Sequence, residues 1–361
     1  MKRRIAALAL AALLLGGTGC SAMLERSYVS ATAHVNYDAM EEDPSVLQAE
    51  NYQSLVNSIL YFVQAHAPTG TIRLYNYTGD VETDLANACA EVLNEDPLGA
   101  YAVRDVRYDT TRIVTYYEVS LSIIYSRSAQ EVAEIRQATG LTSLRSALSE
   151  AVGSLQDHAA IRLSNLSWTR QELEELFWQA YYSNPIYAVP GTQVELTLYP
   201  DDGAQRILEY TISWPQTMTA LVDRAGQLTR AASQLLQSAA LPEEPGPVDL
   251  ARVLRGAVSY APEGSADPLD AFSGITANEM GLLLSMELLC RQADLDCVLV
   301  IGSLHQEPYC WLIVENGESY RHLLPQDLTG QGGQGVALYT DEELAQLGYS
   351  WQAGLYPVCL A

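Results

Sequence analysis

Lysine is almost missing from this sequence, since Lys2 is the only one in 361 residues. Lysine and arginine together number 20 against 44 acidic residues, which gives a formal net charge of −24 at pH 7. A chain so short of cations repels a phosphate backbone, and this excludes nucleic acid as a partner. Charged residues make up 18% of the chain and hydrophobic residues 48%, which excludes a mainly disordered protein.

Histidine and cysteine are also scarce and widely spaced. Neither an i,i+4 histidine pair nor a C-x-x-C motif occurs, so the common zinc sites and small disulfide-stapled scaffolds are excluded. We therefore expect no metal and no cofactor, and we expect the cysteines of the folded part to be buried thiols. The five histidines are His34, His66, His158, His305 and His322, and the six cysteines are Cys20, Cys89, Cys290, Cys297, Cys310 and Cys359.

The amino-terminal segment has the composition of an export signal. Lys2, Arg3 and Arg4 precede an apolar run over 5–15, and small residues follow at 16–19. The run is too short for a stable membrane-spanning helix, which needs about 20 apolar residues.

Cys20, directly after these small residues, resembles the acylated cysteine of a bacterial lipobox. Gly17 departs from that motif, which usually has leucine three residues before the cysteine. The resemblance implies a signal peptide over 1–19, a lipid on Cys20 and a tether over 20–43. It places the protein on the extracytoplasmic face of the cell membrane. The alternatives are an ordinary signal peptide and an uncleaved anchor.

An internal repeat organises the middle of the chain. The pattern Ile-Arg-Leu-x-Asn occurs at 72–76 and again at 161–165. Each copy is followed by a helical pattern, a proline and two alternating stretches, so each predicts β-α-β-β. The units span about 71–125 and 160–214 within a duplicated α+β region at 44–239.

Three further helices are predicted around these units. Asp43 and Pro44 have the character of a helix start, and apolar residues follow at helical spacing as far as Phe62. Helical patterns also cover 130–139 and 141–155.

Proline separates this region from the rest of the chain. Three prolines and a glycine lie within 241–247, a composition that can neither continue a helix nor join the centre of a sheet. We expect a linker at 240–247 and a separate domain at 248–361. In that domain, Asn278 or Thr276 can cap a long apolar helix, and strand patterns follow at 297–301, 309–314 and 319–324. A helix followed by an antiparallel meander indicates an α+β fold.

This last segment resembles the transglutaminase-like superfamily, which has a papain-like fold. The resemblance rests on Gly281 near the start of the helix, a turn and strand over 294–302, and Glu307-Pro308, Trp311 and Pro325 in register with the family pattern. It spans roughly 248–328. It implies a helix-plus-antiparallel-sheet domain with a nucleophilic cysteine, a histidine and an aspartate at fixed positions.

The three catalytic positions hold other residues here. Glu279 occupies the position of the nucleophile, Tyr309 that of the histidine and Leu324 that of the aspartate. A carboxylate is not a thiolate, a tyrosine with a pKa near 10 is a poor base at neutral pH, and leucine has no polar atom to orient either. We therefore expect a domain without catalytic activity.

The resemblance leaves a cleft that can bind without catalysing. We expect it to involve Glu279, Gly281, Tyr309 and Trp311, and we expect a binding or structural role at the cell envelope. The expected partners are the membrane, reached through the lipid on Cys20, and a peptide, cell-wall material or an envelope protein. The alternative is an active cysteine hydrolase or acyltransferase that uses a displaced pair such as Cys310 or Cys290 with His305.

Overall fold

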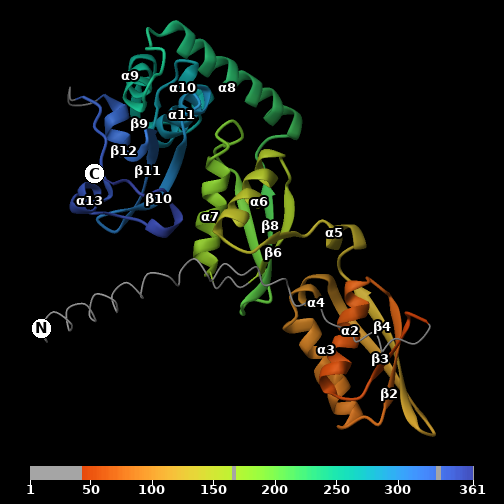
Figure 1. The fold of residues 1–361 in the computed structure, drawn as a ribbon. Coiled ribbons are helices and arrows are strands. Elements are labelled where there is room, and N and C mark those ends of the chain that lie inside the picture. Colours follow the sequence, from red (N-terminus) through yellow and green to blue (C-terminus); the bar gives the residue numbers. More distant parts are fainter. Residues whose placement is uncertain (1–42, 165–167, 331–334, 361) are drawn as a thin grey trace, which may run out of the picture. The chain divides into compact units, whose positions relative to one another are not determined.

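The computed structural model describes residues 43–164, 168–330 and 335–360, and it divides the chain into two compact units. One unit contains Met1–Val92 and Asp105–Ile124, and the other contains Leu93–Arg104 and Tyr125–Ala361. Helices and three four-stranded sheets make up the described part, so the fold is a mixed α+β one (Figure 1). Cys20 lies outside the described residues. No helix in the described residues has the length and apolar character needed to cross a membrane.

The first unit is built on one sheet with the strand order β1-β2-β4-β3. Strand β1 runs parallel to β2, and β2 runs antiparallel to β4. The elements of this part of the chain are β1 Val46–Ala49, α2 Tyr52–Gln64, β2 Thr69–Tyr75, α3 Val81–Asn94, α4 Pro97–Ala102, β3 Val103–Ile113 and β4 Tyr116–Tyr125, of which α4 belongs to the other unit.

The predicted helix start at Asp43-Pro44 is wrong. Strand β1 comes first, and α2 begins only at Tyr52, behind a capping box formed by Asn51 and Ser54. Leu47 and Ala49 are buried at alternating positions of β1, which pairs with β2 along its whole length. Four residues are too few for their periodicity to separate strand from helix, so the pairing with β2 decides the conformation.

The second sheet has the strand order β5-β6-β8-β7. Counted from the first strand of each sheet, both orders are first, second, fourth, third. Strand β5 is parallel to β6, and β6 is antiparallel to β8. In both sheets the predicted β-α-β-β succession is preceded by one more strand and helix. The elements are α5 Ala129–Ala133, β5 Arg136–Ala138, α6 Leu141–Gly153, β6 His158–Ser164, α7 Arg170–Tyr182, β7 Gln193–Tyr199 and β8 Gln205–Ser213.

The helix predicted over 130–139 is also corrected. Helix α5 ends at Ala133, and the next residues form β5, whose register places Arg136–Ala138 opposite Ile161–Leu163 of β6. The backbone hydrogen bonds of β6 therefore override a weak helical pattern.

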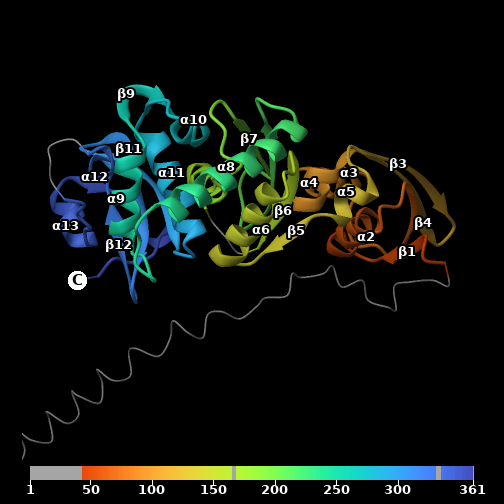
Figure 2. The same ribbon diagram turned by 90° about the horizontal axis from the view of Figure 1, so that it is seen from above.

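The carboxyl-terminal sheet has the order β12-β11-β10-β13, with every neighbouring pair antiparallel. Helices α9 and α11 lie side by side over one face of it (Figure 2). The elements are α8 Met218–Ser238, α9 Pro247–Ala257, β9 Tyr260–Ser265, α10 Pro268–Phe272, α11 Glu279–Gln292, β10 Cys297–Leu304, β11 Glu307–Asn316, β12 Ser319–Leu323, α12 Pro325–Thr329, α13 Asp341–Gln346, β13 Tyr349–Ser350 and a 3-10 helix at Ala353–Leu355.

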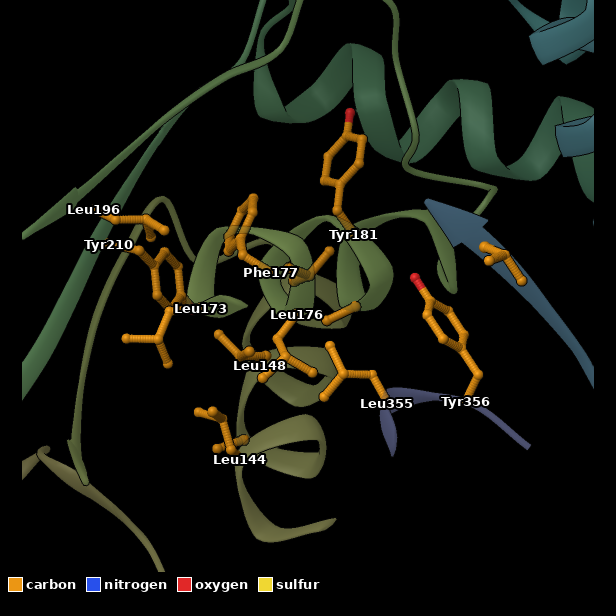
Figure 3. Packing of buried hydrophobic residues seen from close by; sticks show 14 of the residues in the cluster. Leu144, Leu148, Leu173, Leu176, Phe177, Tyr181, Leu196, Tyr210, Leu355 and Tyr356 are labelled. Atoms are coloured by element: carbon orange, nitrogen blue, oxygen red, sulfur yellow. The ribbon is translucent and has the colours of Figure 1, made fainter. Parts of the chain in front are cut away.

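Both faces of this sheet are buried, each in a different hydrophobic cluster. Trp311 and Ile313 of β11 belong to a cluster that also contains α6, α7 and the second sheet. Leu312 and Val314 belong to a cluster with α9 and α11. The first cluster also takes in residues near the carboxyl end of the described chain. Figure 3 shows Leu355 and Tyr356 beside Leu176 of α7.

An almost fully buried arginine joins the second sheet's loops to α8 and α10. The side chain of Arg224 on α8 is 5% exposed and donates to the carbonyls of Ile186 (2.9 Å) and Ala188 (3.2 Å). It also forms a 2.5 Å ion pair with Asp267, which caps α10. Arg224 therefore holds three segments of the second unit together.

We expect Arg224→Ala to lower the free energy of unfolding by about 3 kcal/mol, because it leaves the Asp267 carboxylate without its cation and two carbonyls without a donor. Chemical denaturation measures this change. Arg252→Ala is the matched control, since Arg252 pairs with Asp249 at the surface and should cost less than about 0.5 kcal/mol. Equal losses in both variants would contradict the role given to Arg224.

Candidate functional site

The amino terminus of α11 is fixed by a cap and by a close backbone contact. Asn278 caps the helix, and its side chain accepts a hydrogen bond from the Gly281 N–H at 3.0 Å. A Cβ atom at Gly281 would lie 2.4 Å from the Ser265 carbonyl oxygen of β9. Only glycine fits there, because no real Cβ approaches a carbonyl so closely. The sequence pattern predicted Gly281 near the helix start and offered Asn278 or Thr276 as the cap, and the structure shows Asn278 in that position.

Glu279 and Tyr309 come together at this helix start. Glu279 is the first residue of α11, and Tyr309 lies on β11 opposite Gly302 of β10. The Tyr309 hydroxyl donates to Oε1 of Glu279 at 3.3 Å, and both side chains are half-buried. Burial, and then the charge of Glu279, raises the pKa of Tyr309 above its ordinary value. Tyr309 is therefore a hydrogen-bond donor at neutral pH and cannot take up a proton as a base.

Leu324 contributes no polar group to this site. It is fully buried, precedes α12 and belongs to the cluster against which Tyr309 packs. Gly281 and Trp311 are also buried. Of the residues predicted to line a cleft, only Glu279 and Tyr309 keep accessible surface.

The displaced cysteine–histidine pair is not formed. Cys290 is fully buried near the end of α11, and Cys310 packs into the cluster on the α11 side of the sheet, away from Tyr309 and Trp311. His305 lies in the exposed turn between β10 and β11, with its ring against Gly348. Among the described residues, no hydrogen bond joins His305 to Cys290 or Cys310.

The remaining thiols are held in the protonated form. Burial raises the pKa of Cys89 and of Cys310 to about 11 and that of Cys359 to about 12. Cys297 also has a raised pKa, through its contact with Cys290 and through burial. None of the five cysteines in the described residues is in a disulfide. Since the thiolate is the nucleophile, these four cysteines offer none at neutral pH.

A buried polar cluster beneath the sheet escaped the sequence analysis. The indole N–H of Trp311 donates to Nδ1 of His322 at 2.9 Å, and Nε2 of His322 lies 2.8 Å from Oδ1 of Asp341. The other oxygen of Asp341 accepts from the backbone N–H of Cys359 at 3.2 Å. No spacing rule links these residues, because the pairing of His322 with Tyr339 brings them together.

This cluster has the composition of a metal site or a catalytic triad. The ligand atoms of His322, Asp341 and Cys359 lie within 4.8 Å of one another. An indole N–H can only donate, so Nδ1 of His322 must accept, and Nε2 carries the proton that goes to Asp341. Both ring nitrogens are therefore in use. The arrangement does not fit a metal ion or a base for Cys359, and it serves to hold the 339–359 segment against β12.

The hydrogen bonds of His322 to Trp311 and Asp341 predict that the protein loses stability in acid. Burial lowers the pKa of His322 below its ordinary value near 6.5, while the bond to Asp341 opposes that change. The folded state then binds fewer protons than the unfolded state. Stability should therefore be complete above pH 6.5 and should fall as the pH drops below that value.

We expect His322→Asn to lose about 2 kcal/mol at pH 7.5, because Trp311 and Asp341 lose their buried partner. It should also flatten the loss of stability between pH 7.5 and 5.5. Denaturation curves at both pH values test this. His305→Asn is the control, since His305 is exposed, and it should leave the pH dependence of the natural chain unchanged. If the stability of His322→Asn depended on pH as strongly as that of the natural chain, His322 would not be the source of the acid sensitivity.

No protein-family model matches this chain, and no curated protein matches it. Among solved structures, one described as "Crystal structure of a TGase" aligns with 63% of this chain and 67% of its own chain, at 11% sequence identity and a TM-score of 0.27. A TM-score of this size does not establish a shared fold.

Proposed function

We propose that this chain is a lipid-anchored protein of the extracytoplasmic membrane face, with a non-catalytic transglutaminase-like domain at 248–361. The single observation that carries the proposal is the hydrogen bond between Tyr309 and Glu279 at the start of α11. In the family that the sequence resembles, a thiol and its base meet at these positions.

The chemistry of this pair supports binding over catalysis. Acyl transfer of the family's kind needs a thiolate nucleophile and a base that takes its proton. Glu279 supplies a carboxylate and Tyr309 a protonated phenol, and Leu324 cannot orient either. Two half-buried polar groups at a helix start can still accept and donate hydrogen bonds to a peptide or to cell-wall material.

The amino-terminal region fits a structural or adaptor role in this proposal. The two sheets with the same strand order are the products of a duplication in our interpretation, and they would carry contacts to an envelope partner. The excess of acidic residues would keep the protein away from anionic headgroups, so the lipid on Cys20 would be its attachment to the membrane.

Replacing Glu279 with cysteine tests the site directly. We expect the thiol of Glu279→Cys to have a lowered pKa, because the helix amino terminus stabilises a thiolate. It should react with iodoacetamide at pH 7 about tenfold faster than the thiol of Gln292→Cys, which is at the exposed carboxyl end of the same helix. The buried thiols of the natural chain should react only slowly with iodoacetamide.

Two results would oppose the proposal. Equal rates in the two variants would mean that the start of α11 does not activate a nucleophile. Rapid alkylation of one cysteine in the folded natural chain would revive the alternative of an active cysteine hydrolase or acyltransferase.

The anchor is tested separately in a bacterial host. Labelling with an alkyne analogue of palmitate should mark the natural chain and bring it into the membrane fraction. Cys20→Ser should abolish both the label and the membrane association, whereas Cys89→Ser should change neither, because Cys89 is buried in the first unit. A labelled or membrane-bound Cys20→Ser variant would contradict a lipid on Cys20.

A further inference from the structure

A cavity lies at the carboxyl end of α11, at the opposite end of the helix from Glu279. Its volume is about 410 Å³, which is within the range of small-ligand sites. The lining comes from the end of α11, the turn into β10, strand β11 and the loop after α7. The lining residues are Ser183, Pro185, Glu287, Arg291, Asp294, Leu295, Asp296, Cys297, Val298 and Glu315.

Glu287 is the unusual member of this lining. It is only 3% exposed, and its Oε2 atom has no hydrogen-bond partner among the described residues. No ion pair of the described residues includes it. A buried carboxyl group without a partner is costly, so proteins normally pair such a group. A carboxyl that lines a cavity and lacks a partner indicates that a ligand supplies the partner.

The charges around Glu287 determine the kind of ligand. Asp294, Asp296 and Glu315 add three more carboxylates, against the single guanidinium of Arg291. Arg291 is exposed and donates to the carbonyl of Ser183 at 3.4 Å. The carboxylates of Asp296 and Glu315 each accept one hydrogen bond, from the Tyr320 hydroxyl and the Asp296 N–H, respectively. The cavity therefore has an excess of negative charge.

The described residues hold no lysine that could supply an ammonium group to this cavity. The only lysine of the chain is Lys2, so none occurs between residues 43 and 360. A metal ion fits less well, because the only described group of histidine, cysteine or acidic residues with ligand atoms within 4.8 Å of one another is His322, Asp341 and Cys359. An ammonium group does not need several ligand atoms close together, because one carboxylate can pair with it and other oxygen atoms can accept its remaining N–H hydrogens.

The geometry points to a binding site for a primary ammonium group, on a small amine or on the lysine side chain of a peptide, with Glu287 as its counter-ion. The three outer carboxylates would attract the cation, and Glu287 would pair with it inside the cavity. This site does not depend on the lipid anchor or on the Glu279–Tyr309 pair.

A proton is linked to this binding. Burial raises the pKa of Glu287 well above its ordinary value; Cys290 and Asp296 raise it further, and Arg291 opposes them. Cys297, Asp294 and Glu315 also face the cavity. The raised pKa favours the protonated form of Glu287 in the empty cavity, and pairing with an ammonium group favours the ionised form. The proton is released to solvent, so amine affinity should increase with pH.

Titration calorimetry of the full chain with butylamine tests the site, with butanol as the uncharged control ligand. We expect butylamine to bind and butanol not to bind, and we expect butylamine affinity to be higher at pH 8 than at pH 6. Glu287→Gln should weaken it about tenfold or more and remove the pH dependence, because the charged partner is lost. Glu318→Gln makes the same charge change in an exposed turn outside the cavity and should leave the affinity unchanged.

The outcomes separate the possibilities. Binding that Glu287→Gln abolishes, in a variant with the circular dichroism spectrum and melting temperature of the natural chain, supports the site. Absence of butylamine binding, or equal affinity in Glu287→Gln, overturns it. Tight binding of Ca²⁺ or Mg²⁺ with no binding of butylamine also overturns it and makes the cavity a metal site. If Glu287→Gln does not fold, Glu315→Gln is used in its place. Weaker butylamine binding in that variant supports the site, and unchanged binding overturns it.

Discussion

Burial of strand β11 on both faces is the constraint on which the second unit depends. Alternate side chains from Tyr309 to Val314 enter two separate clusters, one shared with the second sheet and one with α9 and α11. A shift of one residue in register would exchange the two sets and place Cys310 where Trp311 now lies. The same register aligns Tyr309 with Glu279 and the Trp311 indole with His322.

The residues that the sequence identified correctly are those with local determinants. Asn278 and Gly281 can be recognised from the order of capping residue, glycine and apolar helix, since a cap acts within one turn. Tyr309 could be placed near Glu279 only through a family resemblance. The geometry now shows a direct contact between them.

The features that the sequence did not predict depend on contacts between distant segments. Strands β1 and β5 are short, and each owes its conformation to a parallel neighbour further along the chain. His322, Asp341 and Cys359 meet only because the segment around Tyr339 pairs with β12. Glu287 lies among apolar residues of α11, and a single sequence cannot show whether its carboxyl has a partner.

The packing of residues 355–359 has a consequence for how the protein matures. Leu355, Tyr356 and Cys359 are part of the core that contains α6, α7 and the second sheet, and the Tyr356 hydroxyl donates to Glu175 across 181 residues of sequence. The ribosome makes β5 to β8 long before it makes these residues. Contacts of such high separation form late, so the second sheet would stay incompletely packed until synthesis passes residue 359. The second sheet therefore completes its hydrophobic core only when almost the whole chain has been made, so the last residues of the chain help to close a core laid down much earlier.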